Sequence, residues 1–270
     1  YPNLIKFFKE NNIEIEKSDM SFSVSVNDTN IEYCGRGING IFSNRANLLN
    51  FRFIKMFLEI ISFYKKNDNL NSTEINLSLG EYLKKQNLSK YFIDYHLIPM
   101  VSAIWSMPPY EANQMPLSFF LKFFQNHGLF KIKERPQWYT VTNRSKTYVN
   151  NILQKISGEH YKNYAVNKIK RNLNGLQVYY GDDNEFFSYD KVIIATHADD
   201  ALKLIDSPLE EEIKILSNFK YKKNIAYIHF DESIMPKNKK NWCSWNSSVD
   251  KSNVNNNAIT YWLNLLQNLK

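Results

Sequence analysis

The stretch Tyr189–Leu204 places small residues where another molecule could approach the main chain. It reads YDKVIIATHADDALKL, and its apolar run Val192–Ile194 is typical of a strand that is buried on both faces. Ala195 and Thr196 follow directly, and a helix with aspartates in its first turn comes next. Because short side chains leave backbone N–H and C=O groups accessible, we expect a ligand to contact the chain where this strand ends.

A predicted three-stranded meander positions this stretch. The upstream sequence AVNKIKRNLNGLQVYYGDDNEFFSYD contains three strand-like segments, separated by turns at Asn174–Gly175 and Gly181–Asn184. A short strand at Trp138–Val141 and a helix at Arg144–Ile156 precede the meander. Residues 136–205 are therefore predicted to have α/β character.

Residues 46–135 are predicted to be mostly helical. The segment NLLNFRFIKMFLEIISFYKK is apolar over most of its circumference, which is typical of a buried helix. Its Phe51–Phe63 part could instead line an access channel or contact a membrane. Ser78–Glu81 fits a capping box, Pro99 predicts a kink, and Gly128 closes a later helix.

Strands are predicted on both sides of this helical region. Two lie within residues 22–34, and three more are predicted at Asn224–Phe230, Asn241–Asn246 and Ala258–Leu266. The loop Gly35–Gly40 lacks the G-x-G-x-x-G spacing of a dinucleotide-binding turn, and no helix is predicted directly after it. The resulting order of elements indicates two interleaved domains and an α+β fold.

The composition excludes several classes of protein. The chain has 270 residues, a formal charge of +7 and 43% hydrophobic residues, which suits one or two domains with a core. Its lysines are scattered, which favours a solvated surface over nucleic-acid binding but allows a mild attraction to anionic membranes. The cysteines and histidines show no metal-ligand spacing, so no metal is expected, and the two cysteines favour a reducing, cytoplasmic location.

Several tryptophans and one histidine could line a substrate cavity. Trp105, Trp242 and Trp245 are candidates, although aromatic residues at this density also build cores. Trp242 and Trp245 are predicted on opposite faces of one strand, so they cannot fill the same core layer. His229 and Asp231 alternate on one strand face and could form a polar pair across a cavity, or end a strand in solvent.

A family resemblance extends over nearly the whole chain. The segments that carry it are, in order, YPNLIKFF, SDMSFSVS, LIPMVSAIWSMPP, FFQNHGL, RPQWYTVTNRSKTYV, YDKVIIATHADDAL, SIMP, WCSWN and ITYWLNLLQ. In these segments the chain resembles flavin-containing amine oxidase-type oxidoreductases and, more narrowly, bacterial NAD/FAD-binding oxidoreductases. The family's dinucleotide fingerprint and its C-terminal flavin-contacting segment have no counterpart here, so we expect the sequence to be the middle of a longer protein. Relatives often carry Gly-Gly-Ser where this chain has Asn143-Arg144-Ser145.

The resemblance implies FAD as the cofactor and an oxidation that passes two electrons to it. It implies that the backbone of Val166 faces the adenine end of the dinucleotide and that Ala195 and Thr196 lie near it. It also matches Lys223 to a lysine that holds a water near the reactive nitrogen of the flavin. The lysines nearby, Lys220 and Lys222, favour the alternative, a solvated lysine in a turn.

The resemblance also implies a division of the chain. Residues 1–40 and 136–205 would form part of the FAD-binding domain, and residues 41–135 and 206–270 the substrate domain. An aromatic content of 15% favours an apolar or lipid-like substrate over a small polar amine. The alternative function is a non-catalytic module that binds an apolar ligand or a protein without flavin.

Overall fold

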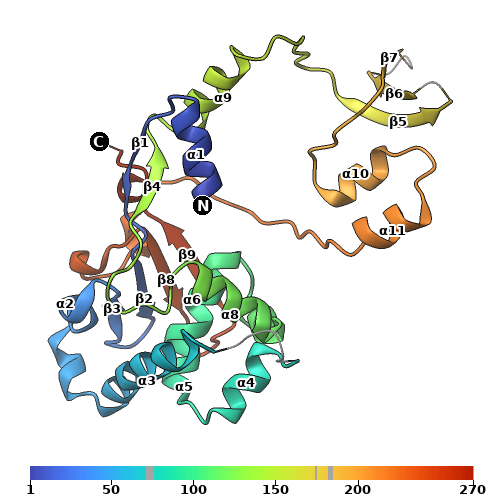
Figure 1. The fold of residues 1–270 in the computed structure, drawn as a ribbon. Coiled ribbons are helices and arrows are strands. Elements are labelled where there is room, and N and C mark those ends of the chain that lie inside the picture. The colour runs from blue at the N-terminus through green and yellow to red at the C-terminus, as the bar shows by residue number, and fades with distance from the viewer. Residues whose placement is uncertain (71–75, 174, 182–184, 270) are drawn as a thin grey trace. The chain divides into compact units, whose positions relative to one another are not determined.

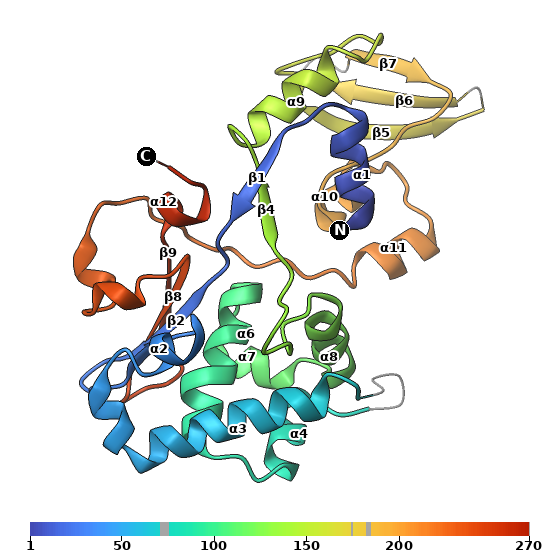
Figure 2. The same cartoon turned by 60° about the vertical axis from the view of Figure 1, so that its left-hand side comes forward.

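The computed structural model describes residues 1–70, 76–173, 175–181 and 185–269. They divide into two compact units, one formed by Tyr1–Lys155 with His229–Lys270 and a smaller one formed by Ile156–Ile228. Figures 1 and 2 show the elements of each unit from two directions. Helices and short sheets together give an α+β fold, which confirms the predicted fold class. None of the described helices is both long enough and apolar enough to cross a bilayer.

A four-stranded sheet with the order β3-β2-β8-β9 lies in the larger unit. Its strands are β2 (Phe22–Val26), β3 (Glu32–Cys34), β8 (Trp245–Val249) and β9 (Asn257–Tyr261). Strand β2 pairs antiparallel with β3 and parallel with β8, and β8 pairs antiparallel with β9. The alternation FSVSV gives the sheet two unlike faces, because Val24 and Val26 join the apolar core while Ser23 and Ser25 point the other way.

Helices cover the apolar face of this sheet (Figure 1). The helices of the larger unit are α1 (Pro2–Glu10), α2 (Gly37–Ile41), α3 (Phe51–Asn67), α4 (Leu79–Lys85), α5 (Lys90–Phe92), α6 (Ile98–Trp105), α7 (Pro109–Gln114), α8 (Leu117–Asn126), α9 (Ser145–Leu153) and α12 (Leu263–Leu266). Short 3-10 turns lie at Arg45–Leu49, Glu232–Ile234 and Lys239–Asn241. The helical content of residues 46–135 is therefore as the sequence predicts.

Helix α3 shows how the sequence directs one face inward. Phe53, Met56, Ile60 and Phe63 recur at helical spacing and are buried in the core. Its N-terminus is fixed by Asn50, whose side-chain oxygen accepts a hydrogen bond of 3.2 Å from the Phe53 amide. The predicted capping box at Ser78–Glu81 is also confirmed, with both of its hydrogen bonds present at the start of α4.

A π-helical segment, Ile93–Leu97, lies directly before α6, and Pro99 stands in the first turn of α6. This segment holds His96, which is buried between two tyrosines. The Tyr33 hydroxyl donates to the Tyr95 carbonyl, so it accepts from His96 Nδ1 at 3.0 Å, and Tyr64 then donates to His96 Nε2 at 2.9 Å. The network joins β3, α3 and the π-helical segment inside the core.

A two-stranded antiparallel sheet, β1 (Ile15–Ser18) with β4 (Trp138–Val141), also lies in the larger unit. Directly after β4 the backbone of Asn143 and Arg144 has φ values of 60° and 70°. Arg144 combines this φ with a ψ of −177°, a region populated almost entirely by glycine. The chain thus adopts a glycine-type backbone at Arg144.

The smaller unit contains the predicted meander, β5 (Val166–Asn172), β6 (Gly175–Tyr180) and β7 (Glu185–Tyr189), as an antiparallel sheet. Two helices follow, α10 (Ala198–Leu204) and α11 (Glu210–Leu216). The turn residue Asn174 and residues 182–184 of the second predicted turn lie outside the described part of the chain. Arg171 on β5 forms an ion pair with Glu212 on α11.

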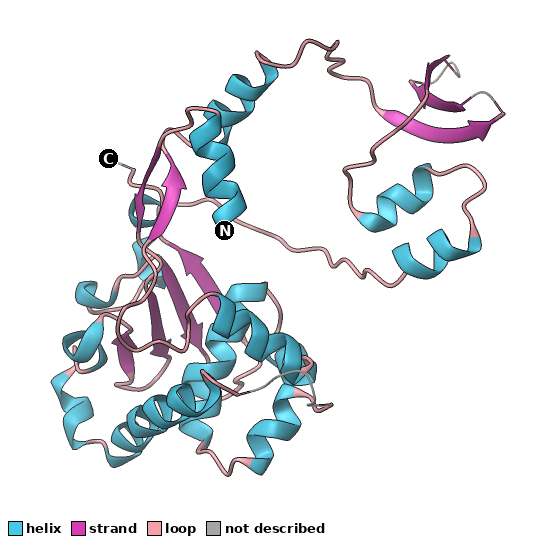
Figure 3. Cartoon of the chain, viewed as in Figure 1, coloured by secondary structure: helices cyan, strands magenta, loops and turns pink. Residues whose placement is uncertain are grey.

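Two predicted strands do not form. Val192–Ile194 and Asn224–Phe230 have no strand partner among the described residues and are drawn as loop in Figure 3. Ile193 is 93% exposed, whereas a strand buried on both faces requires neighbouring strands and covering helices. Their apolar, β-branched composition favours strands, but strand propensity acts only where a pairing edge exists.

Three further predictions are corrected in their boundaries. Asn241–Asn246 is mainly a 3-10 turn and a bend, because β8 begins only at Trp245. Ala258–Leu266 contains the end of β9 and then the short helix α12. The loop Gly35–Gly40 contains the start of α2, whose first residue, Gly37, has a φ of 70° that only glycine adopts readily.

The compact units do not follow the predicted domain boundaries. The β2–β8 pairing places residues 22–26 in the same sheet as residues 245–249, whereas the prediction assigned these segments to different domains. The larger unit also contains residues 136–155. The assignment of segments to cofactor or substrate binding remains a prediction.

Candidate functional site

Three predicted cofactor-binding residues lie together in the smaller unit. Val166, Ala195 and Thr196 line one groove of about 340 Å³. Its other lining residues come from β5, β6, the end of β7, the segment 191–194 and α10: Ile169, Val178, Tyr189, Lys191, Val192, Ile193, Ile194 and Leu204. Residues 30 positions apart in the sequence thus meet at one apolar surface.

The segment Val192–Thr196 is held against the meander at its two ends. Upstream it continues from β7, and downstream α10 packs on β5, where Asp206 donates its amide hydrogen to the Ile169 carbonyl at 2.8 Å. Ile169 itself is buried and anchors this contact. Between these points the segment is extended but joins no sheet, so its main-chain groups face the groove or solvent rather than a neighbouring strand.

The groove therefore combines apolar side chains with main-chain polar groups. Within the described residues, the backbone amides of Val192–Thr196 donate no hydrogen bond to another backbone group. The Thr196 hydroxyl donates a hydrogen bond of 3.1 Å to the His197 carbonyl. Flat heteroaromatic rings need this combination, because their faces pack on apolar carbon while their edges carry donors and acceptors.

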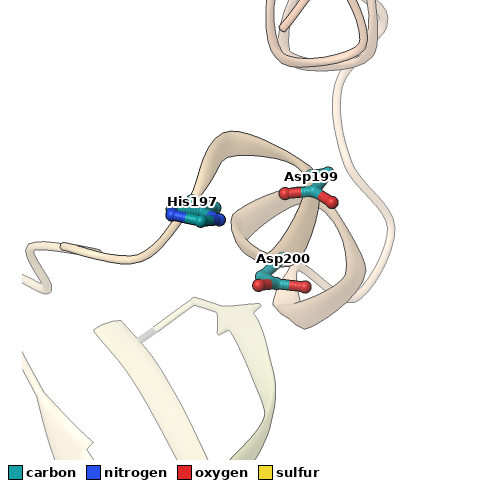
Figure 4. A group of neighbouring side chains, drawn as sticks. All are labelled: His197, Asp199 and Asp200. Carbon is teal, nitrogen blue, oxygen red and sulfur yellow. The ribbon is translucent and has the colours of Figure 1, made fainter. Parts of the chain in front are cut away.

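His197, Asp199 and Asp200 gather at the start of α10, as Figure 4 shows. Lys203 contacts both carboxylates, Asp200 at 2.9 Å and Asp199 at 3.9 Å, and its hydrogen bond lowers the pKa of Asp200. The His197 ring stacks on Tyr221 with centroids 4.2 Å apart. The two aspartates lie in the first turn of α10, where the helix dipole favours acidic side chains, and Lys203 offsets part of their charge.

Lys223, the predicted catalytic lysine, also lies in the smaller unit. It is exposed and belongs to an extended segment outside any sheet. The structure gives Lys223 no salt bridge and no hydrogen bond within the described residues. Its proposed role depends entirely on the family resemblance.

A polar cleft of about 880 Å³ lies in the larger unit, on the serine-bearing face of the four-stranded sheet. Ser25, Ser248 and Thr260 line it from three neighbouring strands. Glu32 contributes a carboxylate, which accepts hydrogen bonds from the Asn238 amide at 2.9 Å and from Asn241 Nδ2 at 3.2 Å. No sequence motif predicts this cleft, although the alternation SFSVSV indicates a strand with one polar face.

The predicted substrate-cavity residues do not gather around this cleft. Trp105 packs on Phe123 with centroids 4.6 Å apart, in the helical region. Trp242 precedes β8 rather than lying on it and packs edge-on against Trp262 at 5.4 Å. Trp245 contacts Tyr261 at 5.3 Å, and none of these tryptophans lines the cleft.

His229 lies at an exposed position where the larger unit resumes. Its Nδ1 accepts a hydrogen bond of 3.1 Å from the Asp231 amide, while the Asp231 carboxylate accepts from the Ser233 amide at 2.8 Å. These Ser233 hydrogen bonds lower the pKa of Asp231. The two side chains therefore form a local turn, and the described structure places neither in the polar cleft.

Neither a model of a known protein family nor a curated protein sequence matches the chain. Several solved structures match it. A putrescine oxidase bound to putrescine matches with 13% identity, and a triple mutant from a structure-based redesign of its cofactor binding matches with 14% identity. Each match has a TM-score of 0.55 and covers 79% of this chain. The chain spans about half the length of these oxidases, namely 49%. At this identity the likeness establishes the fold alone: the chain has the α+β fold of part of an amine oxidase.

Proposed function

We propose that the chain is part of an FAD-dependent oxidoreductase and that the groove at Val166, Ala195 and Thr196 receives the adenine end of FAD. The observation that supports this most directly is the convergence of these three residues on one groove. The family resemblance implies the same three residues for FAD. The amine oxidase fold of the chain is consistent with the same role.

The groove fits this group chemically. Its apolar side chains can pack on the faces of an adenine ring, and the unpaired backbone of Val192–Thr196 can supply donors and acceptors to the ring edge. FAD, when bound, supplies the two-electron acceptor, while the protein binds it, orients it and excludes water. Lys223 is proposed to hold a water at the reactive end, as the resemblance implies.

The substrate is proposed to be an amine or an apolar, lipid-like molecule that gives up two electrons. The polar cleft adds an argument for an amine, because the Glu32 carboxylate can attract an ammonium group and the neighbouring hydroxyls can accept its hydrogen bonds. The aromatic richness of the chain remains the argument for an apolar substrate. A cytoplasmic location is proposed on the two unpaired cysteines, Cys34 and Cys243.

Titration calorimetry with FAD, ADP and FMN tests the groove. ADP carries the adenine end of the dinucleotide and FMN the flavin end, so the groove should bind FAD and ADP but not FMN. In Val166→Asp the new carboxylate repels the diphosphate of either ligand, and we expect at least about tenfold weaker binding. Val166 is partly exposed, so the variant should fold.

Leu173→Asp is the control, because Leu173 is fully exposed, follows the last residue of β5 and does not line the groove. Equal losses in both variants would assign the effect to surface charge rather than to the groove. Absence of binding to FAD and ADP alike would contradict the proposal and favour the non-catalytic binding module. Anaerobic bleaching of bound FAD by a diamine or by an acyl lipid then separates the two substrate classes.

A further inference from the structure

An exposed apolar ridge marks the start of α3 and the 3-10 turn before it. Leu48, Leu49, Phe51 and Leu58 form the ridge, with Leu49 and Phe51 exposed to 92% and 79%. Phe51 and Leu58 are seven residues apart and so lie on one side of the helix, opposite the buried Phe53 and Ile60. Helix α3 is therefore apolar on its outer side as well as on its core side.

The ridge is held rigidly rather than left as a mobile loop. Asn44 accepts a hydrogen bond of 3.1 Å from the Ala46 amide, and Asn50 caps α3 through the Phe53 amide. Between them Asn47 is buried and donates to the Glu32 carbonyl at 3.4 Å. The fold thus keeps Leu48 and Leu49 in solvent-facing positions, because they could join a core only if these hydrogen bonds broke.

Positive charge lies beside the ridge. Arg52, Lys55, Lys90 and Lys251 line a groove of about 690 Å³ that also includes Phe51. Asp94 is the one carboxylate among the groove's lining residues, and burial raises its pKa. A second hollow, which contains Leu49, Phe51 and Arg52, joins the groove to the ridge. Apolar and basic side chains therefore form one continuous surface.

This combination identifies the chemistry of the partner. We propose that the ridge and the basic groove dock the protein on the surface of an anionic phospholipid bilayer. The apolar side chains would enter the boundary between headgroups and acyl chains, while the four cations contact lipid phosphates. Lys55 already has an ion pair with Glu59 at 3.9 Å. A protein partner of purely apolar surface would still desolvate Arg52, Lys90 and Lys251 without supplying an anion, which is costly. The proposal is independent of flavin binding.

Vesicle co-sedimentation of the whole chain tests the proposal. We expect binding to vesicles of phosphatidylcholine with phosphatidylglycerol, and little binding to phosphatidylcholine alone. Leu49→Gln with Phe51→Gln should lower the partition coefficient at least about tenfold. Arg52→Gln with Lys90→Gln should lower it about tenfold or more on anionic vesicles and should flatten its dependence on salt. All four side chains are exposed, so the variants should fold.

Matched controls are Ile38→Gln for the apolar pair and Lys122→Gln with Lys133→Gln for the basic pair, because these exposed residues lie outside the ridge and groove. An equal loss in Lys122→Gln with Lys133→Gln would assign binding to the net charge of +7. An equal loss in Ile38→Gln would assign it to exposed apolar surface in general. Either result overturns the proposal. Absence of vesicle binding overturns it as well. Lipid-free self-association that Leu49→Gln with Phe51→Gln abolishes would make the ridge a contact between copies instead.

Discussion

Apolar side chains are buried in the helical core of the larger unit but remain accessible to solvent after the meander of the smaller unit. In α3 and α8, apolar side chains at helical spacing are buried against each other. In Val192–Ile194 an equally apolar run remains solvent-accessible, with no strand beside it among the described residues. A helix satisfies its own backbone and needs only one covering surface, whereas a buried strand needs partners on both edges and both faces.

Removing a ring from the helical core should have the largest effect. Phe124 is fully buried, and its ring lies 4.3 Å from Phe120 and 5.1 Å from Phe130 by centroids. Phe124→Ala should lower the free energy of unfolding by ~3–5 kcal/mol, since it leaves a cavity that these rings cannot fill. Urea denaturation followed by tryptophan fluorescence measures the change, because all five tryptophans lie in the larger unit. A loss below ~1 kcal/mol would show that this core is loosely packed.

Elements that depend on neighbouring residues can be predicted from the sequence, whereas contacts between distant segments cannot. Capping at Ser78, the helix of Phe51–Asn67 and the meander are encoded by neighbours within a few residues, and they appear as predicted. The polar cleft depends on β2 and β8, which meet from opposite ends of the chain, so no local pattern could locate it. The convergence of Val166 with Thr196 was likewise available only through the family resemblance.

The His96 network should make the helical core sensitive to acid. Burial, with a smaller contribution from the charge of Arg135, lowers the pKa of His96 from 6.5 to about 3. Between these pH values His96 is protonated in the unfolded chain but not in the folded core. The contribution of His96 to the free energy of unfolding is therefore full above pH 6.5 and decreases as the pH drops toward 3. The slope should approach ~1.4 kcal/mol per pH unit, the limit for one proton.

Urea midpoints from pH 7 to pH 4 measure this slope. His96→Gln keeps a side chain that can donate and accept hydrogen bonds but cannot titrate. Its unfolding free energy should therefore depend less steeply on pH than that of the unchanged protein, whatever its absolute stability. Parallel slopes in the two proteins would show that carboxylates, not His96, dominate acid unfolding.

Restoring glycine at the strained turn should have a smaller, opposite effect. Arg144 holds a φ of 70° with a ψ of −177°, a conformation that costs side-chain-bearing residues ~1–3 kcal/mol. Arg144→Gly should therefore stabilise the larger unit by ~1 kcal/mol, because relief of strain outweighs the added freedom of the unfolded chain. Arg144→Ala retains the strain and serves as the control. A destabilised glycine variant would mean that the guanidinium makes a contribution larger than the strain.

The smallest expected effect is that of Ile193, whose side chain is exposed, in contrast to the buried Ile169 of the same unit. Ile193→Ser should change the stability of the smaller unit by no more than ~0.5 kcal/mol, because the side chain is already in solvent. Ile169→Ser, on β5 of the same unit, should cost ~2–4 kcal/mol, because that residue is buried beneath α10. Hydrogen exchange of the β6 amides reports both, since the smaller unit contains no tryptophan. If Ile193→Ser instead lowers the stability as much as Ile169→Ser, the run Val192–Ile194 is covered in solution. That result would favour the buried strand that the sequence predicts.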